Sequence, residues 1–385
     1  MSAPASGLPL ARLRGWAASA AGGLAQAAGA SAAPIGLELS PERLNMVQFD
    51  RAAGAPTIRA AVSLPYAGGR QRLLDDPAGL QALVRQALRS RPFRGRRVVS
   101  CLPAADIRTV MVSYQAAAGQ DDAVAIVREL RERLKTELDG AVVDYLPIRN
   151  DDSPSAERSA IVAVAEHERV VAYLEALRRA GLEAVALDIG PAALARLVAA
   201  LDRTRSHANA LLLNFGHARS YISLIWGRRL MLDREVDFGE ARLVQRLATV
   251  LSMAEPEALR LLHEHGVDAS GEGGRAASPA VARTVAEVLR PAFGALAQEI
   301  NKTLIYTASR TRGRSVDCIH LLGSAARYPG IAALLQRLVS IPVEVIDPLR
   351  AFGMRPGACA EGELGPIAGI GVATGLALRG QGSDG

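Results

Sequence analysis

Two segments of this 385-residue chain carry small and polar residues of the kinds that bind phosphate. They are Leu37–Arg43 and Asn214–Ser220, and strand-like apolar residues flank each one, which predicts two β-hairpin turns. Backbone N–H groups in such turns bind phosphate oxygens where small residues allow close approach. A third segment, Gly323–Ala326, is also rich in small residues. The candidate nucleotide-binding residues are Glu38, Ser40, Asn214, Gly216, His217, Gly323, Ser324 and Ala325.

The elements around these turns recur along the chain. Ile35–Tyr66 is predicted to form a strand, a turn and two more strands, and Ala210–Val236 has the same plan. The two copies start about 175 residues apart, which indicates an internal repeat of one supersecondary unit. Between and after the copies, strands alternate with amphipathic helices such as Asp121–Leu138, so the sequence predicts an α/β fold.

Composition and charge exclude several classes of protein. The chain is 49% hydrophobic and 22% charged, as expected for globular domains, and its net charge is +6. Arginines are interleaved with acidic residues and aromatic residues make up only 4%, so nucleic-acid binding is not predicted. The basic balance is more compatible with weak attraction to an anionic inner leaflet. Since the three cysteines are far apart and the histidines lack ligand spacing, neither a disulfide framework nor a metal site is expected.

The N-terminal stretch, residues 1–34, is rich in Ala and Gly. It superficially resembles a signal peptide, but its apolar part holds almost no large aliphatic side chains. The stretch is therefore predicted to be a cytoplasmic extension, with a partly helical segment and a low-complexity tail as open alternatives. No run reaches the ~20 consecutive apolar residues that a membrane-spanning helix needs.

Five segments resemble the PilM family of type IV pilus assembly proteins, in the family's order. They are IGLELSPERLNMVQF, VAVAEHERVVAYLEALRRAGLEAVALDIGPAALARLV, LLLNFGHARSYISLIWGRRLMLDREVDFG, the stretch Glu299–Leu349 and GPIAGIGVATGLALRG. The resemblance implies an actin-like, ribonuclease H-like fold with two lobes. It also implies an FtsA/PilM-type inserted subdomain at about 96–150. The first lobe would span residues 35–205, and the second would span 206–380 with a helical insertion at about 240–315.

In the family scheme, ATP and Mg²⁺ lie between the two turns, and Asp188 is the acid that could order a hydrolytic water. This chain departs from the pattern at the turns. Glu38 and Ser40 stand where active members have Asp and Gly, and Pro41 removes an N–H donor. Asn214 replaces an Asp that would organise Mg²⁺, and Glu42 adds negative charge near the expected phosphates. These departures favour a pseudoenzyme, with residual nucleotide binding and a working ATPase as alternatives.

The resemblance implies that the chain grips the cytoplasmic tail of a PilN-like bitopic membrane protein, peripherally on the inner membrane. Exposed edge strands in Arg96–Tyr114 are candidates to accept that tail by strand addition. Contact with the pilus assembly ATPase is implied as well, and homo-oligomers are compatible with it. Three rivals share the superfold: a small-molecule kinase, a cell-division actin homologue and the cytoplasmic half of a type II secretion component. MshI-like platform proteins are not separable from PilM by this comparison.

Overall fold

The structure is a computed structural model. It describes residues 32–50, 55–115, 121–134, 138, 140–148, 157–201, 209–268, 278–311, 313–349, 352–359 and 367–379. Of the predicted N-terminal extension, only residues 32–34 belong to this part. Most of the expected boundary between the lobes, near residues 203–209, also lies outside it.

The first half of the chain builds most of a six-stranded sheet with the order β14-β3-β2-β1-β4-β8. Strands β1, β2 and β3 are antiparallel, whereas β1, β4 and β8 run parallel. Helices α2 (Gly69–Leu74), α3 (Pro77–Ser90) and α5 (His167–Arg179) contribute to the core on one side of this sheet. The strands are β1 (Ile35–Leu39), β2 (Arg43–Phe49), β3 (Thr57–Pro65), β4 (Arg97–Cys101), β8 (Glu183–Asp188) and β14 (Gly353–Met354).

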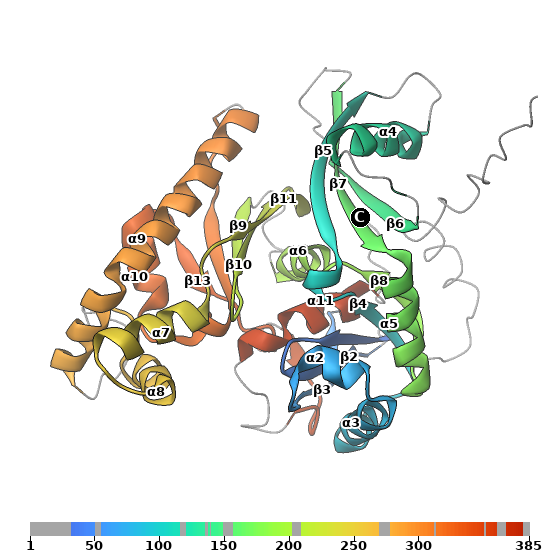
Figure 1. Cartoon of the computed structure of the whole chain (residues 1–385), viewed down its shortest axis with the longest axis horizontal. Helices are drawn as coiled ribbons and strands as arrows, with labels where there is room; N and C mark the ends of the chain where they lie inside the picture. The colour runs from blue at the N-terminus through green and yellow to red at the C-terminus, as the bar shows by residue number, and fades with distance from the viewer. Residues whose placement is uncertain are drawn as a thin grey trace, which may run out of the picture.

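The second half repeats this plan in a five-stranded sheet with the order β11-β10-β9-β12-β13. Strands β9, β10 and β11 are antiparallel, and β9, β12 and β13 are parallel, so the repeated unit predicted from the sequence is confirmed. The strands are β9 (Ala210–Phe215), β10 (Ser220–Trp226), β11 (Arg229–Val236), β12 (Cys318–Gly323) and β13 (Val343–Val345). The helices are α7 (Glu240–Val250), α8 (Glu255–His265), α9 (Pro279–Arg310) and α10 (Ile331–Val339). Figure 1 shows the long α9 along the outer side of this sheet.

A third, small sheet has the order β5-β7-β6. It consists of β5 (Arg108–Gln115), β6 (Ala141–Ile148) and β7 (Glu157–Glu166), and α4 (Asp122–Leu134) packs on one face through Ala125, Ile126 and Leu130. In Figure 1 it stands above the six-stranded sheet.

The range of about 96–150 expected for the inserted subdomain differs from the range of this sheet. Strand β4 lies inside the six-stranded sheet between β1 and β8, and β7 lies at the centre of the small one. The burial of β4 gives the physical reason. Val98 and Val99 are adjacent and both fully buried, as in a central parallel strand that is covered on both faces.

Two helices, α6 (Gly190–Leu201) and α11 (Gly371–Arg379), lie between the two large sheets (Figure 1). A hydrophobic core joins α6 and α11 to residues from β2, β9 and β12. A Cβ at Gly36 of β1 would lie 2.0 Å from the carbonyl oxygen of Ala373, and one at Gly375 would lie 1.9 Å from that of Ala193. Glycine at both positions therefore lets α11 touch both β1 and α6. Residues 371–379 thus pack on the first sheet, although the sequence assigned them to the second lobe.

No helix in the described part of the chain is long and apolar enough to span a bilayer.

Candidate functional site

The third predicted segment lies directly against the second hairpin turn. Gly323 has φ +91°, and a Cβ there would lie 2.0 Å from the carbonyl oxygen of Phe215. The Oγ of Ser324 is 3.4 Å from the carbonyl oxygens of both Phe215 and Gly216, and Ala325 is fully buried. The structure therefore brings together the candidate residues of the second turn and of the third segment.

The backbone of the second turn is bonded to the N-terminus of α7. The carbonyl oxygens of Gly216 and His217 accept hydrogen bonds from the N–H groups of Glu240 at 3.2 Å and Ala241 at 2.9 Å. Gly239 allows this approach, because a Cβ there would lie 2.3 Å from the carbonyl oxygen of Ala218. The N–H groups at a helix N-terminus have no partner within the helix and commonly bind anions. In α7 two of these groups are already bonded to the carbonyl oxygens of the second turn.

Glu240, which the sequence reading missed, is buried beside the second turn and the third segment. Its Oε1 accepts hydrogen bonds from Arg327, at 3.1 Å, and from the Tyr328 hydroxyl. Its Oε2 lies 3.7 Å from Nδ1 of His217. Burial, followed by the bond to Glu240, raises the pKa of Tyr328 well above its ordinary value. The sequence signal that could have identified Glu240 is its position directly after Gly239, in the first turn of α7.

The first hairpin turn is also closed by its own hydrogen bonds. The backbone N–H and the Oγ of Ser40 both donate to the carbonyl oxygen of Arg43 at 3.0 Å. The Arg43 N–H donates back to the Ser40 Oγ at 3.2 Å, and the Tyr66 hydroxyl donates to the Ser40 carbonyl. Pro41 and Glu42 are exposed at the tip. The donor that Ser40 could offer to a phosphate is therefore used inside the turn.

Glu38 lies half-buried on β1. Its Oε2 accepts a hydrogen bond from Nδ2 of Asn45 at 3.1 Å, and the same amide donates to the carbonyl oxygen of Gly369 at 2.8 Å. Burial raises the pKa of Glu38 to about 7, against the opposing effects of Asn45 and Arg70. This carboxyl is therefore only partly ionised near neutral pH, which makes it a weak organiser of a metal ion.

Asp188, the candidate catalytic acid, is held by two arginines. Its Oδ2 is 2.9 Å from Nη2 of Arg196 on α6 and 3.1 Å from Nη1 of Arg379 on α11. Its Oδ1 accepts a hydrogen bond from the Ile189 N–H at 2.8 Å. Only 8% of its side chain is exposed. With both oxygens engaged, Asp188 ties β8 to α6 and α11, and it is poorly placed to order a water molecule.

Carboxyl ends of the parallel strands β1, β4 and β8 place Glu38, Cys101 and Asp188 along one edge, where Cys101 is in register with Asp188. Burial and the two carboxylates raise the pKa of the Cys101 thiol, which therefore stays protonated. No group of three or more potential metal ligands occurs among the residues that the structure describes.

Comparisons with known proteins bear on the family and the fold. The sequence profile of the family described as type IV pilus assembly protein PilM matches residues 36–381. A solved PilM-PilN type IV pilus biogenesis complex is similar over 90% of this chain and 98% of that chain, with 23% identity and a TM-score of 0.70. The ethanolamine utilization protein EutJ from Carboxydothermus hydrogenoformans is similar over 90% of this chain and 89% of its own, with 14% identity and a TM-score of 0.51. The predicted actin-like α/β fold is confirmed.

Proposed function

Because the chain belongs to the family of the type IV pilus assembly protein PilM, we propose that it is a cytoplasmic adaptor of the inner-membrane platform of a type IV pilus or related secretion system. Its partner is the cytoplasmic tail of a PilN-like bitopic protein, and this contact holds the chain peripherally at the inner membrane. The solved PilM-PilN complex supports the choice of partner.

The observation that carries the proposal is the state of the nucleotide site. Ser40 is bonded within its own turn, and the N-terminus of α7 is bonded to the second turn. Asp188 is neutralised by Arg196 and Arg379. Phosphoryl transfer depends on positioned donors and charge stabilisation around the phosphates, and these groups are engaged elsewhere. The alternative is an active ATPase or kinase whose nucleotide state controls partner binding, and the same contacts argue against it.

The small sheet offers a place for the tail. Of the strands in the stretch expected to accept a peptide, β4 is interior to the six-stranded sheet and is excluded. Strand β5 is an edge strand, and among the described residues it pairs with β7 alone. The other edge strand, β6, contains Pro147 and contacts β11 of the second sheet, so β5 is the better acceptor.

Hydrogen–deuterium exchange of the protein with and without a synthetic tail peptide tests this site. Strand addition would protect every second amide of Arg108–Gln115, because the N–H groups that face away from β7 would gain partners. The amides of α8, on the far side of the second sheet, serve as the internal control and should not change. Protection confined to other segments would exclude β5 as the acceptor.

A further inference from the structure

A strongly basic surface lies on the first lobe, away from the nucleotide site. Between Asp76 and Asp106 the chain contains no acidic residue, yet it contains six arginines. These are Arg85, Arg89, Arg91, Arg94, Arg96 and Arg97. We name this segment, Arg85–Arg97, the arginine surface. It covers the end of α3 and the connection to β4, at the bottom of the molecule in Figure 1.

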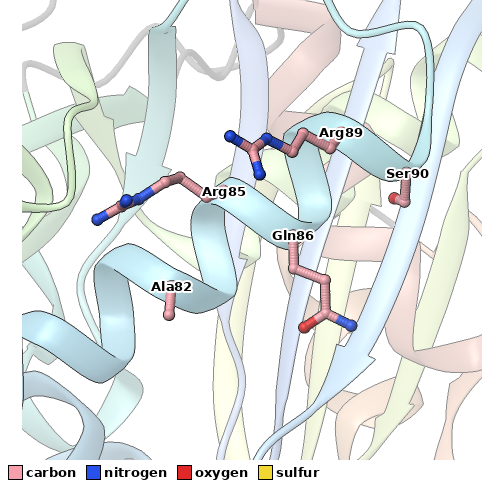
Figure 2. A pocket seen from close by; sticks show the side chains of 5 residues that line it. All are labelled: Ala82, Arg85, Gln86, Arg89 and Ser90. Carbon is pink, nitrogen blue, oxygen red and sulfur yellow. The ribbon is translucent and has the colours of Figure 1, made fainter.

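Arg85 and Arg89 are the centre of this surface. They lie one helical turn apart on α3, both are exposed, and Figure 2 shows them projecting to the same side of the helix. Together with Ala82, Gln86 and Ser90 they line a hollow of about 620 Å³. Arg85 donates a hydrogen bond to Gln81. Within the described residues neither Arg85 nor Arg89 forms an ion pair with a carboxylate. Two like charges at this spacing destabilise a helix slightly, so the fold gains nothing from them.

We propose that the arginine surface binds an acidic, extended segment of a partner polypeptide. Guanidinium groups bind carboxylates through paired N–H···O bonds, which fixes both position and orientation. Side chains one helical turn apart are about 6 Å apart. Alternate residues of an extended chain have nearly the same spacing, roughly 6.6 Å, and face the same way. Acidic side chains at every second position therefore match Arg85 and Arg89.

Other occupants fit less well. The chain's own first 31 residues include Arg12 and Arg14 but no acid, so they do not complement the surface. A basic surface also attracts anionic lipids, but stable interfacial binding adds apolar side chains that are buried among the lipids. The exposed large hydrophobic side chains in the described part of the chain are Val124, Val171, Val250, Ile305, Leu338, Val345 and Met354. All of them lie outside the arginine surface.

The test is fluorescence anisotropy with a labelled eight-residue peptide of alternating Glu and Ser, and with a Gln–Ser peptide of equal length as the neutral probe. The full chain should bind the acidic peptide one to one and the neutral peptide far more weakly. The double variant Arg85→Glu with Arg89→Glu should weaken binding at least tenfold, and raising the salt from 50 to 300 mM should weaken wild-type binding as well. Circular dichroism should show that the variant is folded, because neither guanidinium supports the core.

The matched control is Arg283→Glu with Arg290→Glu, which makes the same change of charge at two exposed positions on α9. This variant should bind the acidic peptide within twofold of wild type. Equal weakening in both variants would overturn the proposal, since only net charge would then matter. Binding of wild type to phosphatidylglycerol vesicles with no affinity for the peptide would overturn it in favour of a membrane. A dimer in sedimentation that is lost in the α3 variant would overturn it in favour of a second copy.

Discussion

Arg196 on α6 lies 2.9 Å from the carboxylate of Asp188 at the end of β8, and it also donates to the carbonyl oxygen of Gly375 on α11 at 2.9 Å. One guanidinium thus connects the strand that carries the candidate catalytic acid to both helices between the sheets. The residue predicted as a catalytic acid therefore belongs to the contact between β8 and the two helices that lie between the large sheets.

Replacing Asp188 should therefore affect stability and not turnover. Asp188→Ala removes the carboxylate that Arg196 and Arg379 share, and the side chains of these arginines are only 28% and 22% exposed, respectively. We expect a loss of about 2 kcal/mol in the free energy of unfolding, measured by urea denaturation. The control Asp237→Ala, in an exposed pair with Arg242, should cost less than about 0.5 kcal/mol. Site-dependent ATP turnover that Asp188→Ala abolishes, with unchanged stability, would contradict the structural role of this residue.

Gly36 should tolerate no side chain, because α11 packs directly on β1 at this position. In Gly36→Ala the new Cβ would lie 2.0 Å from the Ala373 carbonyl oxygen and 2.4 Å from the Ala377 N–H nitrogen. Both are backbone atoms of α11, so the helix must move away from β1, at a cost of about 3 kcal/mol or a loss of soluble protein.

Gly294→Ala on α9 is the matched control for Gly36→Ala. Nothing lies within 4 Å of its would-be Cβ, so the change should raise the free energy of unfolding by up to about 1 kcal/mol through helix propensity. Both values come from denaturant unfolding. If the two alanine variants were equally stable, α11 would not be packed on β1 as described.

Glu38 should make stability fall with rising pH. Its pKa is raised from 4.5 to about 7 in the folded protein, so the folded state holds the proton more tightly than the unfolded state. The free energy of unfolding should decrease between pH 4.5 and pH 7 and stay constant above that, by at most about 3 kcal/mol from this group.

Glu38→Gln should therefore be more stable than wild type at pH 8 and not at pH 4.5. Thermal unfolding at the two pH values measures this. Glu42→Gln, in the exposed tip of the adjacent turn, is the control for the removal of a nearby carboxyl group. If Glu38→Gln changed the unfolding temperature equally at the two pH values, burial would not disfavour the ionised form of Glu38.

Much of this architecture follows from local patterns. The hairpins at Ser40 and Gly216 and the repeated strand plan could be predicted, because alternating apolar residues and small turn residues act within a few positions of each other. The sheet that a given strand joins could not be predicted from local patterns. Strands β4 and β7 both contain apolar runs, and their places depend on pairing with other segments of the chain.

The contacts within the candidate site could not be predicted from local patterns either. The sequence identified Glu38, Asn214 and Asp188 by residue type. It could not show that Asp188 meets Arg379, 191 positions further along the chain, or that Glu240 meets Tyr328. Such pairs are fixed by the packing of α11 and α7, which no local periodicity specifies.

The most direct test of the central claim is calorimetric titration of the protein with a synthetic tail peptide from its PilN-like neighbour, with and without Mg²⁺ and ATP. The closed turns and the engaged Asp188 predict peptide binding without nucleotide, and an affinity that ATP leaves within twofold. ATP alone should give little or no heat. Tight ATP binding, or peptide binding only in its presence, would contradict the account and would restore a nucleotide switch to the mechanism.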